Sequence, residues 1–120
     1  MNGHVDDAGR ALLTIEIAST RRAPNAEVVV WIDTAFDGHL MLPSGMIKDL
    51  ELEPLAQTEG ILANGSRVVL EAFFGYVDWF GQKIPLQVIA NEGRMPLLGT
   101  AMLAGRVLQI DYREHTVTLI

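Results

Sequence analysis

Alternating apolar and polar positions near the start of the chain predict a first β-strand at residues 12–18. This segment places apolar side chains at every second position, with polar side chains between them. The positions expected to point inward are Leu13, Ile15 and Ile17, and those expected to point outward are Thr14 and Glu16. A period of two is typical of a strand with one buried face. The polar and acidic residues before it, 1–10, are expected to form a flexible N-terminal tail.

A second apolar segment, 28–32, reads Val-Val-Val-Trp-Ile and contains no polar position. Such continuous β-branched and aromatic sequence is typical of a strand that is buried on both faces. The segment ends at Asp33, and the turn signal Asp37-Gly38 follows before 40–42 resume an extended apolar stretch. A carboxylate at the end of a core strand costs free energy unless it is hydrogen-bonded. Asp33 is therefore a candidate functional residue.

Turn signals divide the remainder of the chain into hairpins and short helices. Asn64-Gly65 is the strongest of these signals, because the pair tolerates positive φ at both central positions of a type I′ turn. The expected arms of this hairpin are 57–63 and 66–74. Further strands are expected at 75–80, 84–90, 107–112 and 116–120, with short helices after Pro43, where Ser44 is the expected N-cap, and around 100–103. With 11 glycines and 5 prolines, this pattern favours an all-β domain.

The composition excludes several classes of function. A chain of 120 residues, 49% of them hydrophobic, has enough apolar material for one core. The net charge is −6 without a cluster of Lys and Arg, which argues against nucleic acid as a partner. Cysteine is absent, which excludes disulfides, thiolate metal sites and cysteine nucleophiles. The histidines, His4, His39 and His115, lack ligand spacing, so we expect no metal and no cofactor.

The hydrophobic segments of the chain are short. None approaches the roughly 20 residues that a helix needs to span a bilayer. Residues 1–10 also lack the basic and apolar regions of a signal peptide. We therefore expect no membrane association and a cytoplasmic location.

Three motifs occur in an order that resembles one family of proteases. The apolar strand that leads into Asp33-Thr34-Ala35 is similar to the catalytic turn of the retropepsin-like aspartic proteases. The Asn64-Gly65 hairpin follows where that family carries its flap, a β-hairpin that folds over bound substrate. Leu97-Leu98-Gly99 resembles the family's apolar-apolar-Gly motif, which precedes a helix. The likeness covers roughly residues 11–120 and is greatest to small bacterial members of the family.

This resemblance implies a fold and an assembly. The fold would be an all-β, closed acid-protease-like β-barrel half with a flap hairpin and one or two short helices, in a single domain at 11–120. The chain carries one Asp-Thr-Ala, so it would act as a homodimer in which each subunit contributes one Asp33. In the viral enzymes of the family, the terminal strands build the dimer interface.

The resemblance also implies a role for each residue of the motifs. Asp33 and its symmetry mate would share one proton and activate a water for attack on a peptide bond of a polypeptide substrate. Thr34 would hold the two turns in register, and Ala35 would present its backbone N–H to the carboxylates. Leu98 and Gly99 would support the turn. The residues expected to contact substrate are Phe36, Ile61, Leu62, Ala63 and Leu97.

Position 100 departs from the viral pattern, in which Arg often follows the apolar-apolar-Gly motif. Thr100 stands there instead, so the ion pair of that Arg with an acid such as Asp37 is missing. One alternative interpretation is a catalytically inactive module of the same fold, used for dimerisation or peptide binding, with Asp33 retained to cap a turn. Another is a small-molecule-binding barrel, which would need a closed cavity and has no obvious polar anchor in the sequence.

Overall fold

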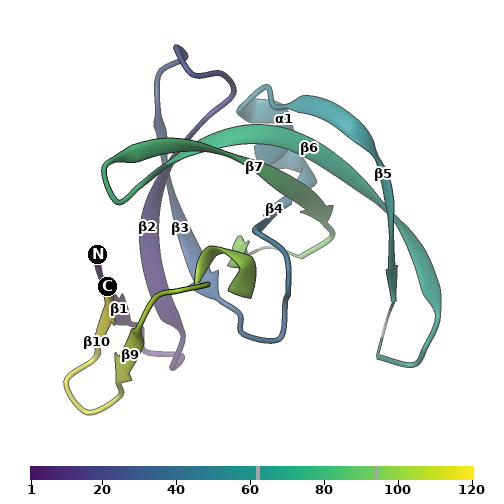
Figure 1. The fold of residues 1–120 in the computed structure, drawn as a ribbon. Helices are drawn as coiled ribbons and strands as arrows, with labels where there is room; N and C mark the ends of the chain where they lie inside the picture. The colour runs from purple at the N-terminus through teal and green to yellow at the C-terminus, as the bar shows by residue number, and fades with distance from the viewer. Residues whose placement is uncertain (62, 94) are drawn as a thin grey trace.

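The computed structural model describes residues 1–61, 63–93 and 95–120. Within these residues the chain is mostly β-structure, with two short helical segments (Figure 1). The strands are β1 (Asn2–Val5), β2 (Ala11–Ala18), β3 (Ala26–Ile32), β4 (Leu40–Pro43), β5 (Glu53–Ile61), β6 (Arg67–Trp79), β7 (Gln82–Asn91), β8 (Leu97–Leu98), β9 (Leu108–Asp111) and β10 (Thr116–Leu119). The helical segments are α1 (Ser44–Asp49) and the 3₁₀ turn η1 (Thr100–Met102).

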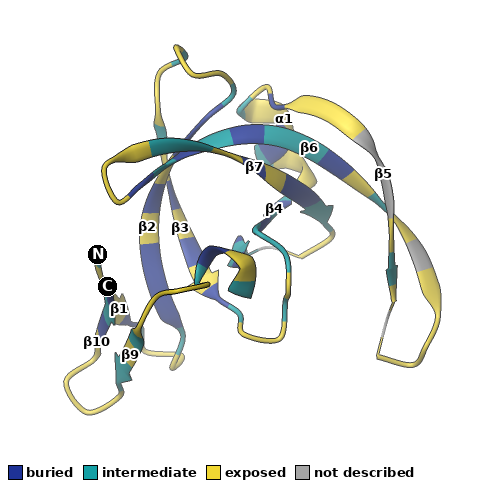
Figure 2. Cartoon of the chain, viewed as in Figure 1, coloured by how far each residue is buried: buried dark blue, intermediate teal, exposed yellow. Residues whose placement is uncertain are grey.

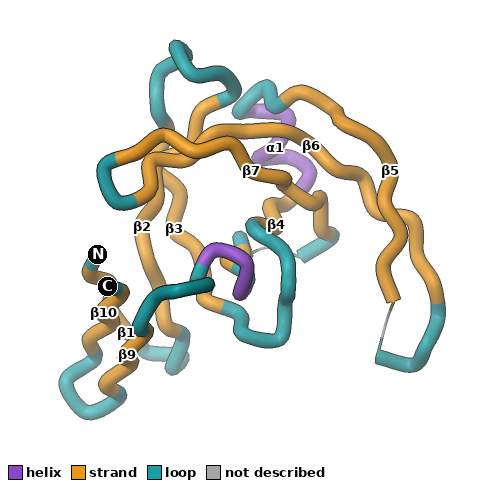
Figure 3. The backbone as a smooth tube through the Cα atoms, in the orientation of Figure 1, coloured by secondary structure: helices purple, strands orange, loops and turns teal. Residues whose placement is uncertain are grey.

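The strands belong to one sheet that closes on itself. Their order along the sheet is β5-β6-β7-β4-β8-β3-β2-β1-β10-β9, and β6 also pairs with β2. This extra pairing joins Ile17 to Val77 and Ala18 to Tyr76, so the strands from β6 to β2 form a closed barrel. Figure 3 shows β5 and β6 arching away from one side of the barrel, and β1, β9 and β10 forming a small sheet at the opposite side. The predicted all-β barrel with two short helices is confirmed.

Alternate side chains of the strands fill the barrel, as the banding of β2 and β3 in Figure 2 shows. On β2, the residues predicted to point inward are buried and those predicted to point outward are exposed. Fully buried side chains from the other barrel strands meet them: Val30, Leu40, Leu42, Val77, Val88 and Leu98. Burial of one such side chain contributes roughly 1.5–3 kcal/mol. Apolar packing inside the barrel is therefore the main source of stability.

The prediction that β3 is buried on both faces is wrong. Val28, Val30 and Ile32 point into the barrel, whereas Val29 and Trp31 are 43% and 38% exposed on the outer face. A strand in a single closed sheet has one face inside and one face outside. A continuous apolar sequence in such a strand therefore leaves half of its side chains on the surface.

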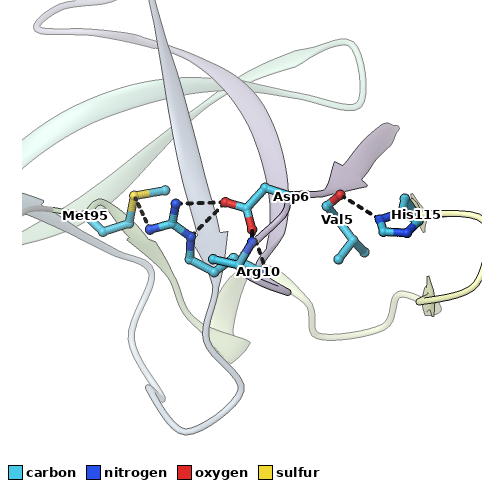
Figure 4. Close-up of polar contacts among 6 residues, drawn as sticks. Val5, Asp6, Arg10, Met95 and His115 are labelled. Carbon is cyan, nitrogen blue, oxygen red and sulfur yellow. Dashed lines mark hydrogen bonds and ion pairs between the residues drawn. The ribbon is translucent and has the colours of Figure 1, made fainter.

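The N-terminal segment forms strand β1 rather than the flexible tail expected for residues 1–10. β1 pairs with β10 on one edge and with β2 on the other. Asp6 then closes the turn into β2: its Oδ1 accepts hydrogen bonds from the N–H groups of Ala8 (3.0 Å) and Arg10 (2.9 Å). Its Oδ2 lies 2.8 Å from the Arg10 guanidinium (Figure 4). The acidic residues that suggested a solvated tail thus include a turn-closing group.

The predicted hairpin at Asn64-Gly65 forms, but its turn is wider than expected. The last paired residues of β5 and β6 are Ile61 and Arg67, which excludes a two-residue type I′ turn. Asn64 Oδ1 instead accepts a hydrogen bond from the N–H of Ser66 (2.9 Å). The side chain of Asn64 therefore stabilises a longer loop.

Strand β6 continues without interruption to Trp79, so the predicted break before Gly75 is wrong. Gly75 lies where β6 passes β2, and it pairs there with Leu86 of β7. Type I′ geometry occurs after β6, at Phe80-Gly81, where φ is 50° and 81°. This turn joins β6 to β7, which share the longest ladder of the barrel.

The helix after β4 lacks the expected N-cap. Pro43 occupies the N-cap position, no side chain caps the helix, and Ser44 is the first helical residue. Pro43 also pairs with Asn91 as the last residue of β4, so the chain passes from strand to helix without a capping residue. No helix within the described residues is long and apolar enough to cross a membrane.

Candidate active site

Asp33 is the first residue after β3, at the start of the turn that leads to β4. Its N–H donates a hydrogen bond to the carbonyl oxygen of Leu98 (2.9 Å), and its own carbonyl oxygen accepts one from the N–H of Phe36 (3.2 Å). The side-chain Oδ1 accepts a hydrogen bond from the N–H of Ala35 (3.0 Å). These contacts hold a partly exposed carboxylate at the end of a core strand.

The segment that follows β8 anchors the turn. β8 lies between β3 and β4, parallel to the first and antiparallel to the second. Consecutive N–H groups after β8 donate to carbonyl oxygens of the turn: Gly99 to His39 (2.9 Å), Thr100 to Phe36 (2.8 Å) and Ala101 to Gly38 (3.2 Å). The position of Asp33 is therefore set by a second segment of the chain as well as by its own turn.

Gly99 is required because the two segments approach closely. A Cβ atom at this position would collide with the carbonyl oxygen of Gly38 and with the Phe36 ring. The backbone of Gly99 is extended (φ −92°, ψ 172°), a conformation open to any residue, so the requirement is one of space. Thr100 takes part in the same contact through its backbone N–H, so a residue with a different side chain at this position could form the same hydrogen bond.

A first hollow, of about 310 Å³, lies beside the Asp33 turn. Its lining residues are Trp31, Ile32, Asp33, Thr34, Ala35 and Leu97. Thr34 and Ala35 are exposed at the tip of the turn. The structure thus brings the predicted catalytic residue, two predicted support residues and one predicted substrate contact to one surface.

A groove of about 410 Å³ runs between the turn and the β5–β6 hairpin. Its apolar lining residues include Phe36, Met41, Ile61, Leu70 and Ile89. Asp37 of the turn and Glu59 of β5 also line it. Glu59 Oε2 is 3.8 Å from Arg67 Nη1 with both side chains largely exposed, so this ion pair contributes little. The groove can receive an extended chain that carries apolar side chains.

The residues predicted to contact substrate do not all meet. Phe36 and Ile61 line the groove, and Leu97 lines the first hollow. Ala63 is exposed beyond the end of β5. Leu62 lies outside the described residues. The groove and the hollow share Ala35, which places the predicted contacts Phe36 and Leu97 on either side of the turn tip.

Strand β7 supplies groove residues that the sequence reasoning missed. Gln87 and Ile89 line the groove, and Ile89 pairs with Met41 of β4. The N–H of Gln87 also donates to His39 Nδ1 (3.3 Å), which ties the Asp33 turn to β7. Alternation along β7 places 87 and 89 on the same face, so their shared direction is visible in the sequence. The sequence does not show, however, that Ile89 pairs with Met41 of β4.

The described residues include no group of three or more His, Asp or Glu side chains placed to hold a metal ion. A cluster of polar contacts around Arg10 lies on the outer face of β3. There the Arg10 guanidinium lies 5.8 Å from the centroid of the Trp31 ring and reaches both Asp6 and Met95 (Figure 4). Hydrogen bonds from the Arg10 backbone, from its guanidinium and from the Ala8 backbone hold the pKa of Asp6 below its usual value.

Comparison with solved structures identifies the fold. The chain is similar to a retropepsin-like aspartic protease from Rickettsia conorii, with a TM-score of 0.71 and 13% identity over 99% of this chain and 88% of that one. The chain has the retropepsin-like fold. The EIAV protease in complex with the inhibitor HBY-793 is also similar (TM-score 0.57, 18% identity, 78% of this chain and 85% of that one). The Simian Foamy Virus (mac) protease gives a TM-score of 0.53 and 16% identity, over 77% of this chain and 90% of that one.

No protein-family model matches the sequence, and no curated protein matches it. The structural likenesses, at 13% to 18% identity, therefore establish the fold. They confirm the resemblance inferred from the motifs, including the acid-protease-like barrel. The fold alone does not establish an activity, because one fold can carry several functions, and the activity depends on the residues of the site.

Proposed function

We propose that the chain is an aspartic endopeptidase that acts as a homodimer. The observation that carries this proposal is the position of Asp33 in a retropepsin-like fold. The residue lies at the end of a core strand and is held by hydrogen bonds with the backbones of Leu98 and Ala35. It lines the hollow that shares Ala35 with the groove. The described chain supplies one such acid, and a second copy related by a two-fold axis supplies the other.

In the proposed dimer, the two Asp33 carboxylates share one proton, because two close negative charges repel each other. The ionised carboxylate accepts a proton from a water molecule, and the water oxygen attacks the carbonyl carbon of the peptide bond. The protonated carboxyl group donates its proton to the carbonyl oxygen. The tetrahedral intermediate then collapses: the C–N bond breaks as the amine nitrogen takes the proton that the first carboxylate accepted from water. The other carboxylate accepts a proton from a hydroxyl group of the intermediate, so the pair again shares one proton.

The groove is the proposed site for an extended polypeptide substrate. Apolar substrate side chains would pack on Phe36, Met41 and Ile61, and the β5–β6 hairpin would act as a flap that hydrogen-bonds the substrate main chain. Thr34 would contact its symmetry mate. Ala35 would present its N–H to the carboxylate, which is consistent with the bond to Asp33 Oδ1.

A catalytically inactive module of the same fold, for dimerisation or peptide binding, is the second candidate. It is favoured by the bond between Asp33 Oδ1 and the N–H of Ala35, which is the local bond that Asp makes in purely structural turns. An asparagine at this position retains that oxygen. In the inactive module, Asp33→Asn would therefore preserve function, whereas in the protease it would remove the acid–base group.

A cleavage assay with a peptide library, from about pH 4 to about pH 7, separates the two candidates. The wild type should cleave, and Asp33→Asn should lower the rate at least about a hundredfold while keeping the fold. Asp49→Asn is the matched control, because Asp49 is an exposed carboxylate at the end of α1, outside the groove and the hollow beside the turn. Absence of cleavage by a well-folded wild-type dimer, or equal rates for wild type and Asp33→Asn, would exclude the protease.

A further inference from the structure

Strand β9 is an open edge surrounded by exposed apolar side chains. It ends the sheet and pairs with β10 on one side. Next to it, Val107, Tyr112 and Ile120 are 62%, 63% and 66% exposed. The strand reads Leu-Gln-Ile-Asp, without the Lys or Pro residues that commonly protect an edge strand from pairing with another chain.

The one charged residue of β9 does not protect the edge either. Asp111 Oδ1 accepts hydrogen bonds from the N–H groups of Arg113 and Glu114, each 2.9 Å long. The carboxylate is thus committed to closing the turn between β9 and β10. The edge of β9 therefore lacks the usual protection against strand pairing, and its backbone groups can hydrogen-bond to a strand of another chain.

The terminal strand β10 is occupied on both edges. It pairs with β9 on one side and with β1 on the other. Beyond the ladders, Leu119 exchanges hydrogen bonds of 2.8 Å with Met1, and Ile120 exchanges bonds of 2.8 and 3.0 Å with Val107. An interface that inserts this strand between strands of a partner would have to break these bonds. Within the small sheet of β1, β10 and β9, the outer edge of β9 is the one that can accept a strand.

We propose that a second copy of the chain pairs with this edge, β9 against β9 in antiparallel orientation, about a two-fold axis at Gln109. This inference rests on the proposed function, because the active site requires a second Asp33. In Figure 1, the β9–β10 hairpin and the turn between β3 and β4 both extend from the lower side of the barrel. A copy attached at β9 therefore lies on the side to which the Asp33 turn projects.

The hydrogen-bond pattern restricts the register of this pairing to a few possibilities. Val107 exchanges both of its backbone bonds with Ile120, and bonding alternates along an antiparallel ladder. Leu108 and Ile110 therefore direct their N–H and C=O groups to the open edge. With the axis at Gln109, Leu108 lies opposite Ile110 of the partner subunit, and the two exchange both backbone bonds. An axis at Leu108 obeys the same alternation but pairs fewer residues of β9. An axis at Ile110 pairs as many, but it sets Gln109 opposite Asp111 of the partner subunit.

The same register brings compatible side chains together. Leu108 meets Ile110 of the partner subunit on one face of the new sheet, an apolar cross-strand pair. On the other face, Asp111 lies opposite Val107 of the partner subunit, so the acid does not meet its symmetry mate. Gln109 meets Gln109 of the partner subunit on the axis, where two amide groups can hydrogen-bond to each other.

A cysteine on the axis tests the register, because the natural chain contains no cysteine. The central pair is of the non-hydrogen-bonded type, with Cα atoms about 4.5 Å apart, which lies within the range for a disulfide. Gln109→Cys, made together with Asp33→Asn to prevent self-cleavage, should form a disulfide-linked dimer under mild oxidation. Arg113→Cys in the same background is the control, because Arg113 is exposed in the turn outside the proposed interface. Equal cross-linking of the two variants would overturn the proposed interface.

Cross-linking and cleavage report on the interface and on the protease separately. In one outcome, Gln109→Cys cross-links efficiently but the folded wild type cleaves no peptide. This outcome would support the interface and overturn the protease. Cleavage by the wild type, with no preferential cross-linking of Gln109→Cys, would overturn the interface and leave the protease standing. If both hold, oxidised Gln109→Cys with an intact Asp33 should keep its specific activity on dilution, whereas the activity of the wild type should fall.

Discussion

Replacing Gly99 with alanine inserts one methyl group between the Asp33 turn and the segment that anchors it. The added Cβ would collide with the carbonyl oxygen of Gly38, a backbone atom that no rotamer change can move away. It would also meet the Phe36 ring. The extended backbone of Gly99 accepts alanine without strain, so the whole effect of the substitution comes from this contact.

The expected loss of stability follows from the two ways in which the site can respond. If the segments stay together, overpacking costs about 1–3 kcal/mol. If they separate, the N–H groups of Gly99, Thr100 and Ala101 lose their partners in the turn, at about 0.5–1.5 kcal/mol each. The two responses together bracket a loss of about 1–4.5 kcal/mol in the free energy of unfolding, a large part of the total for a small domain. Both responses also displace Asp33, so cleavage should fall with stability.

Urea unfolding at fixed protein concentration, followed by the fluorescence of the buried Trp79, measures this change. With a slope of about 1–3 kcal/mol per molar urea, the midpoint should fall by about 1 M. Gly45→Ala is the matched control: a Cβ at Gly45 meets nothing within 4 Å, and the residue lies in α1, so this variant should gain up to about 1 kcal/mol. Equal midpoints for Gly99→Ala and the wild type would refute the packing argument.

Two further predictions concern the groove and the N-terminal turn. Ile61→Ala should raise KM several-fold, because Ile61 lines the groove, and should change the free energy of unfolding by less than about 0.5 kcal/mol, because Ile61 is 75% exposed. Peptide kinetics and urea unfolding measure the two effects separately, and an unchanged KM would contradict the prediction. Asp6→Asn should lower stability at neutral pH, because the native contacts with Arg10 hold the pKa of Asp6 below its usual 3.8. A carboxyl group whose pKa is lowered in the native state stabilises the fold at pH values above its unfolded-state pKa, and this stabilisation is lost as the pH falls through its native-state pKa. The difference between wild type and variant should therefore shrink below about pH 4, and a constant difference across a pH series of unfolding curves would contradict the assignment.

Much of the candidate site was visible in the sequence because its signals are local. The change from an apolar strand to Asp33 marks the end of β3, and Leu97-Leu98-Gly99 marks the segment that holds the turn. The supporting role of Leu98 and Gly99 was expected from the family resemblance, but the backbone hydrogen bonds through which this segment holds the turn appear only in the structure. The sequence did not predict that Met41 and Gln87 line the groove, because their positions there depend on which strands become neighbours.

The sequence by itself determined which faces of β2 are buried, where the Asp33 turn lies and that the domain is all-β, because periodicity and turn chemistry act within a few residues. Tertiary structure decided that Val29 and Trp31 face outward and that residues 2–5 join the sheet. It also decided that β6 runs unbroken across β2 to close the barrel. These outcomes depend on strands that are distant in sequence finding their neighbours, and a local pattern does not specify its partner.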